Sequence, residues 1–156
     1  MLRAAWIFFC LAMVALIFLL NGCAATKQPE IKRTISTKTF RVYGPPVLVD
    51  RLLEACDIDK INTKVARLLG LEKKFLVFNI LSERDFRSKF NRISRKSDAC
   101  YLNGVIYISS WIINNRFDLL WTVYHEVDHA YPESTEYTAS YTACLYTDDS
   151  RCKGIF

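Results

Sequence analysis

Histidine is scarce in this sequence, and glycine and proline are few. The 156 residues include two histidines, five glycines and four prolines. No internal repeat or low-complexity segment is present, so repeat and fibrous architectures are excluded. Any site that binds a metal through imidazole therefore has only His125 and His129 to use. The length leaves room for one domain with one modest hydrophobic core.

The N-terminal segment is dominated by an apolar run from Ala4 to Leu20, which follows Arg3. The run is near the short limit for crossing a bilayer, which favours a secretory signal over a retained membrane anchor. It ends in Leu20-Asn21-Gly22-Cys23, which resembles the lipobox of bacterial lipoproteins. That resemblance implies that residues 1–22 are a signal peptide and that Cys23 is lipidated.

The segment after Cys23 has few large apolar residues and several charges, which is typical of a flexible tether. We expect the tether to span residues 23–39 and the folded domain to span residues 40–156. The lipoprotein resemblance places the domain in the cell envelope, anchored by lipid and facing the periplasm. Ala24 after the lipidated cysteine resembles the pattern of outer-membrane lipoproteins.

Four cysteines remain once Cys10 is assigned to the signal and Cys23 to the lipid. Cys56, Cys100, Cys144 and Cys152 would lie in an oxidising compartment, where they can form two disulfides. Sequence alone leaves three pairings open. The simplest closes a short loop between Cys144 and Cys152 and leaves Cys56 with Cys100.

Hydrophobic periodicity and turn signals predict an α+β fold, with several helices around a small, mostly antiparallel sheet. Gly70 tolerates the positive φ of a helix C-terminus, and Asn103-Gly104 is typical of a type I′ hairpin turn. Asn115 is expected to cap the helix that follows it. Helices are predicted over 48–56, 61–69, 82–93, 115–131 and 133–146, with strands over 75–81, 99–102 and 105–109.

The segment His125-Glu126-Val127-Asp128-His129 matches HExxH. Residues i and i+4 lie on one face of a helix, so both imidazoles can reach one ion, and zinc suits such nitrogen ligands. Glu126 would lie beside the metal, where a carboxylate can accept a proton from water that the ion has acidified to a pKa of about 7. The pattern predicts a Zn²⁺ cofactor and Glu126 as the catalytic base.

From about Cys100 to Tyr146, the sequence resembles the zincin metallopeptidases, and the gluzincins among them. The resemblance implies hydrolysis of a peptide bond, with a substrate bound in extended form along a sheet-edge strand. Val105–Ser109 is expected to be that strand. Apart from the resemblance, Tyr137 and Tyr141 are candidates to stabilise the transition state, with structural packing as the alternative role of each.

Catalytic zinc usually has three protein ligands, so a third must follow His125 and His129. In gluzincins the third ligand is a glutamate from a helix after the motif, and Glu136 resembles it. Glu133 is the alternative, but only three residues separate it from His129, which leaves little chain to reverse direction.

HExDH is also the form of the motif in peptide deformylases, whose metal site adds an upstream cysteine. Cys100 could take that role. The sequence lacks the glycine-rich GxGLAAxQ segment of that family, and an exported Cys100 is expected in a disulfide. A metallopeptidase is therefore the preferred interpretation.

The alternative from another class is a non-catalytic envelope lipoprotein that binds a partner, with a structural metal or none. Nucleic acid is not an expected partner, because Phe86 and Phe90 fall opposite the basic face of residues 84–96 and are predicted to be buried. The expected partners are a peptide or protein substrate and the membrane, through the N-terminal lipid.

Overall fold

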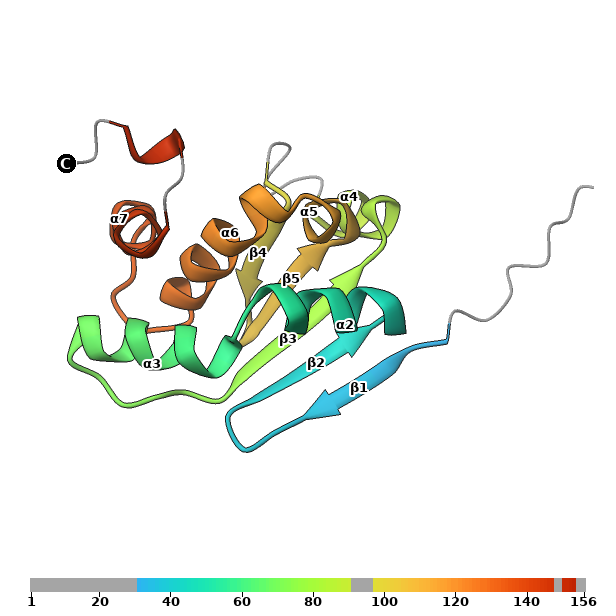
Figure 1. Ribbon diagram of the computed structural model, residues 1–156, viewed down its shortest axis with the longest axis horizontal. Helices are drawn as coiled ribbons and strands as arrows, with labels where there is room; N and C mark the ends of the chain where they lie inside the picture. Colours follow the sequence, from blue (N-terminus) through green and yellow to red (C-terminus); the bar gives the residue numbers. More distant parts are fainter. Residues whose placement is uncertain (1–30, 91–96, 148–149, 154–156) are drawn as a thin grey trace, which may run out of the picture. The chain divides into compact units, whose positions relative to one another are not determined.

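The computed structural model describes residues 31–90, 97–147 and 150–153. They form six α-helices and a five-stranded mixed sheet, which confirms the α+β prediction (Figure 1). The predicted signal peptide and Cys23 lie outside the described residues. In chain order the elements are β1 (Arg33–Ser36), β2 (Phe40–Gly44), α2 (Pro46–Ala55), α3 (Ile58–Leu69), β3 (Leu76–Leu81), α4 (Glu83–Phe90), β4 (Ala99–Leu102), β5 (Val105–Ser109), α5 (Ser110–Asn114), α6 (Arg116–His129), α7 (Glu136–Tyr146) and a 3-10 turn, η1 (Ser150–Cys152).

The strand order of the sheet is β1-β2-β3-β5-β4. β1 and β4 pair antiparallel with β2 and β5, whereas β2-β3 and β3-β5 are parallel. The prediction of a mostly antiparallel sheet is therefore wrong in this detail. Between β2 and β3, the helices α2 and α3 return the chain, so both strands run in the same direction. Between β3 and β5, the strand β4 runs back antiparallel, so β5 has the direction of β3.

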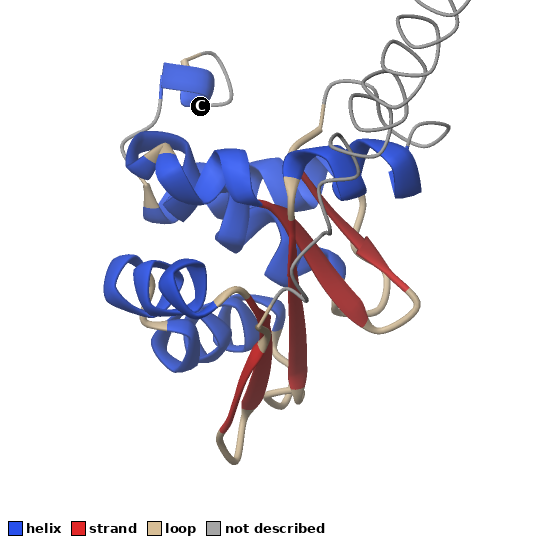
Figure 2. Cartoon of the chain, turned by 90° about the vertical axis from the view of Figure 1, so that its right-hand side faces the viewer, coloured by secondary structure: helices blue, strands red, loops and turns tan. Residues whose placement is uncertain are grey.

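The main core lies between one face of the sheet and the helices α2, α3 and α6, which Figure 1 shows lying across it. Figure 2 shows most of the helices gathered on one side of the strands. Alternate residues of β5, Ile106 and Ile108, point into this core, and Tyr107 therefore points to the other face. There the buried Phe90 of α4 contacts the Tyr107 ring, with 5.0 Å between the ring centroids.

The folded domain begins earlier than predicted. β1 pairs with β2 inside the segment expected to be a tether, so the fold starts by Arg33 rather than at residue 40. The mostly polar composition of β1 gave no strand signal, because an exposed edge strand needs no apolar face of its own. None of the helices in the described residues has the length and apolar character needed to cross a bilayer.

Several local signals are confirmed. Gly70 ends α3 with φ of 67°, and Asn103 and Gly104 of the β4-β5 turn have φ of 49° and 83°. Asn115 precedes α6 as expected, but its side chain donates to the Asp118 carboxylate at 2.6 Å and does not cap the backbone. α7 begins at Glu136, three residues later than predicted, because the Thr135 side chain caps it by accepting from the Thr138 amide.

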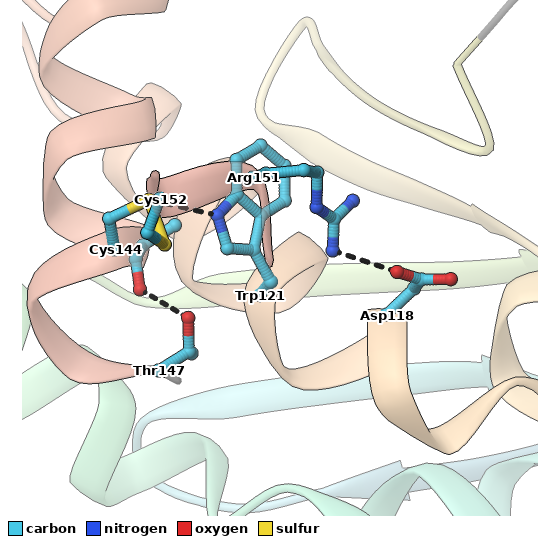
Figure 3. Close-up of a disulfide and its surroundings, with 7 residues drawn as sticks. Asp118, Trp121, Cys144, Thr147, Arg151 and Cys152 are labelled. Carbon is cyan, nitrogen blue, oxygen red and sulfur yellow. Dashed lines mark hydrogen bonds and ion pairs between the residues drawn. A yellow bond between two sulfur atoms is a disulfide. The ribbon is translucent and has the colours of Figure 1, made fainter. Parts of the chain in front are cut away.

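The cysteine prediction is half confirmed. Cys144 at the end of α7 is bonded to Cys152 of η1 (Figure 3). Cys56 and Cys100 are free, so their predicted pairing is wrong. Cys56 is buried in the main core at the end of α2, where burial raises the pKa of its thiol to about 12, whereas Cys100 lies on the edge strand β4.

The disulfide fixes η1 against α6. The Arg151 guanidinium lies over the Trp121 ring at 4.0 Å from its centroid and pairs with the Asp118 carboxylate at 3.0 Å. Trp121 donates its indole N–H to the sulfur of Cys144 at 3.5 Å. Figure 3 shows these groups together at one end of the disulfide.

We predict that Cys152→Ser lowers the free energy of unfolding by about 2.5 kcal/mol, because the short loop between Cys144 and Cys152 is no longer closed. Urea denaturation monitored by circular dichroism measures the change. The matched control is Cys100→Ser, which removes a free thiol and should leave the midpoint nearly unchanged. Equal midpoints for Cys152→Ser and the wild type would contradict the pairing.

Candidate metal centre

The two histidines lie one turn apart near the C-terminal end of α6, as the motif predicts. Their Nε2 atoms are 3.1 Å apart, and both side chains are largely buried. α6 is packed against the core through Leu119, Val123 and Val127, which leaves His125 and His129 on the side that faces α7. The helix therefore presents both imidazoles to one point.

Glu136 completes the group from the first turn of α7. Its carboxylate oxygens lie 3.3 Å from Nε2 of His125 and 3.5 Å from Nε2 of His129. One ligand atom from each of the three residues lies within 4.8 Å of the others, so the three side chains could hold a metal ion. The Glu136 side chain is 86% exposed, so its position depends on where α7 begins.

Glu133 does not join this group. It adopts a φ of 67° in the turn between α6 and α7 and lines a separate depression with Leu71 and Pro132. The turn needs this residue to reverse the chain, which is the geometric reason for expecting Glu136 rather than Glu133. The structure therefore brings together His125, His129 and Glu136.

The His125 imidazole is neutral at physiological pH. Burial, and then the neighbouring His129, lower the pKa of His125 to about 4, against a smaller opposing effect of Glu136. The Trp121 ring stacks on the imidazole with centroids 4.8 Å apart and planes inclined by 21°. A neutral imidazole keeps the lone pair that a metal ligand needs.

Glu126 is buried beside the candidate ligand group of His125, His129 and Glu136. Burial raises the pKa of its carboxyl to about 7, although a hydrogen bond from the Tyr101 backbone opposes the shift. A carboxyl with a pKa near neutrality exchanges protons readily at neutral pH, as a general base must. Glu126 thus extends from the last turns of α6 towards strand β4, which contains Tyr101.

These residues line a cleft of about 390 Å³, which is large enough for a small ligand or part of a peptide. One wall consists of His125, Glu126, His129 and Glu136, and the other consists of Ser97, Ala99, Cys100 and Tyr101. The second wall is β4 and the residues before it.

β5 is internal, between β3 and β4, so the prediction that Val105–Ser109 is the edge strand is wrong. β4 is the edge strand instead, because it pairs antiparallel with the outer side of β5.

The remaining predicted residues differ in their relation to the cleft. Cys100 lines it, and burial, followed by the charges of Glu126 and Glu136, raises the pKa of its thiol. Its sulfur is not part of the group of ligand atoms. The Tyr137 side chain points largely into solvent, at 70% exposed, and among the described residues neither Tyr137 nor Tyr141 lines the cleft.

Asp128 was not singled out as a functional residue by the sequence, although it is fully buried next to the site. Its carboxylate accepts hydrogen bonds from the hydroxyls of Ser134 and Thr142, and a longer one from Thr138. The sequence does carry a signal for this arrangement. Ser134, Thr138 and Thr142 recur every fourth residue, which places three hydroxyls on one side of α7 and its N-terminus.

Comparison with models of protein families, with curated proteins and with solved structures gives no match.

We predict that Glu136→Gln weakens zinc binding by at least about 100-fold, because loss of a direct ligand should exceed the 10- to 100-fold effect of outer-shell residues. Competition with a chromogenic chelator measures the affinity. Glu133→Gln is the matched control, since Glu133 lies only three residues away but outside the ligand group. Equal losses in the two variants would exclude Glu136 as the third ligand.

Proposed function

We propose that this protein is a zinc-dependent peptidase of the cell envelope. One observation carries the proposal. Glu136, which lies outside the HExxH motif, meets both histidines of the motif in space, and Glu126 is buried in the same cleft. A chance HExxH on an amphipathic helix would not require a carboxylate from another helix at this point.

The donor set supports zinc as the metal. Two imidazole nitrogens and one carboxylate oxygen are the ligands of many catalytic zinc sites, which keep a further position open for water or substrate. His125, His129 and Glu136 would hold the ion. When bound, zinc supplies Lewis-acid polarisation of a carbonyl group and acidifies water.

Glu126 has the position and the proton affinity of a general base. Its carboxylate would take a proton from the water that attacks the scissile carbonyl carbon. The same proton would pass to the amide nitrogen as the C–N bond breaks, which leaves a carboxylic acid and an amine and returns Glu126 to its starting state. Burial of Glu126 strengthens this exchange by keeping bulk water from competing.

β4 supplies a surface for a peptide in extended form. It pairs with β5 on one side only, and among the described strands no other pairs with its outer edge. An added strand could hydrogen-bond to this edge while its backbone crosses the cleft. The lipobox resemblance at Cys23 supports a location at the envelope, facing the periplasm, and Ala24 after it supports the outer membrane.

We expect Glu126→Gln to reduce peptide hydrolysis by about 10²- to 10⁴-fold, because the amide cannot accept the proton from water. The measurement is cleavage of a quenched-fluorescence peptide library by the zinc-loaded, full-length chain. Zinc content should remain at one ion per chain, since Glu126 is not a ligand. Glu133→Gln should cleave at the wild-type rate.

The alternative, a lipoprotein that binds a partner around a structural metal, gives a different result. In that case the chain binds one zinc ion, and Glu126→Gln leaves any residual cleavage unchanged. Absence of cleavage by the zinc-loaded wild type, across the library and denatured casein, would also contradict a peptidase.

A further inference from the structure

Ser134 lies between a buried carboxylate and one of the two histidines. Its hydroxyl oxygen is within hydrogen-bond distance of Oδ1 of Asp128 and is 3.3 Å from Nδ1 of His129. The contact with Asp128 is the shorter of the two. Ser134 belongs to the turn between α6 and α7, so the turn that positions Glu136 also reaches the back of His129.

The single hydroxyl proton of Ser134 determines the direction of these bonds. A carboxylate can only accept, so Ser134 donates to Asp128. The hydroxyl oxygen is then an acceptor towards Nδ1 of His129, which must carry a proton to bond to it. A neutral imidazole with a proton on Nδ1 has an unprotonated Nε2, whose lone pair can bind a metal.

His125 has a different environment. Its Nδ1 is buried, with no hydrogen-bond partner among the described residues. Its Nε2 lies 3.3 Å from a carboxylate oxygen of Glu136 and 3.1 Å from Nε2 of His129. The Glu136 carboxylate and the unprotonated Nε2 of His129 can each accept a hydrogen bond from Nε2–H of His125. This favours the His125 tautomer with its proton on Nε2.

We propose that Asp128 and Ser134 are positioning residues that set the tautomer of His129 for metal binding, whereas His125 must move its proton from Nε2 to Nδ1 when metal binds. The two ligands of the motif are therefore not equivalent. His129 is preorganised by a hydrogen bond at its Nδ1, whereas Nδ1 of His125 has no partner among the described residues and its ring is stacked on Trp121. The inference rests on the proposed metal site but not on peptidase activity.

Asp128 can act in this way because it is rigidly held. Its Oδ2 accepts from Thr142 at 2.6 Å, and its side chain is fully buried. Partners of this kind orient a metal-binding histidine and raise its basicity, and their loss typically weakens metal binding 10- to 100-fold.

The test is NMR of the full-length chain in detergent, labelled with ¹⁵N-histidine and stripped of metal. The chain has only two histidines, so the imidazole spectrum reports the two proposed ligands and nothing else. At about pH 8, where neutral imidazole dominates, long-range ¹H–¹⁵N correlations should show His129 with its proton on Nδ1 and His125 with its proton on Nε2. Added zinc should leave the His129 tautomer unchanged and switch that of His125.

Ser134→Ala should convert His129 to a mixture of tautomers and weaken zinc binding about 10- to 100-fold. Ser134→Thr keeps the hydroxyl and should restore both properties. The matched control is Thr142→Val, which removes a bond to the same carboxylate without touching His129. It should lower the melting temperature but keep the His129 tautomer. Its zinc affinity should stay within about threefold of the wild-type value, which is a smaller change than loss of an orienting partner causes.

The proposal is overturned if metal-free wild-type His129 carries its proton on Nε2, or if Ser134→Ala preserves both the tautomer and the zinc affinity. It is also overturned if Thr142→Val changes the His129 tautomer as much as Ser134→Ala does, because the effect would then be general loosening. The tautomers are measured without metal or substrate, so a failure of Glu126→Gln to affect cleavage would exclude the peptidase and leave this result standing.

Discussion

The packing of α7 against the end of α6 is the constraint on which the site depends. The buried Asp128 carboxylate, accepting hydrogen bonds from the Ser134 and Thr142 hydroxyls, joins the two helices where they meet. Because Thr135 caps α7, its first residue is Glu136, and the packing brings that exposed carboxylate to both histidines. A shift of α7 by one residue would turn Glu136 away by about 100°.

The opposite end of α7 is fastened in a different way. The Cys144–Cys152 disulfide holds η1, whose Arg151 lies over Trp121, and Trp121 in turn stacks on His125. One covalent link and one buried carboxylate thus act at the two ends of a single helix pair. Each supports a different histidine of the motif, so the ligand group is held from both sides.

The sequence predicted those parts of the fold and the site that depend on local spacing. The i, i+4 spacing placed His125 and His129 on one helical face, and Gly70 and Asn103-Gly104 marked a helix end and a hairpin. Glu136 was also predicted, because a short turn after His129 can reverse the chain by residue 136 but not by residue 133.

What the sequence did not predict depends on contacts between distant segments. The pairing of β1 with β2, the internal position of β5 and the separation of Cys56 from Cys100 follow from how the sheet is assembled. The role of Asp128 was missed for the same reason. Its neighbour in the chain, His129, is a candidate ligand, but the hydrogen-bond partners of Asp128 belong to the next helix and to the turn before that helix.

X-ray absorption spectroscopy at the zinc edge of the zinc-loaded, full-length chain tests the central claim most directly. The proposed zinc site predicts one zinc ion per chain, with a first shell of nitrogen and oxygen at about 2.0–2.2 Å, two histidine imidazoles among the ligands, and no sulfur. A sulfur shell at about 2.3 Å would assign Cys100 to the metal in place of Glu136. That result, or failure to bind zinc at all, would contradict the account.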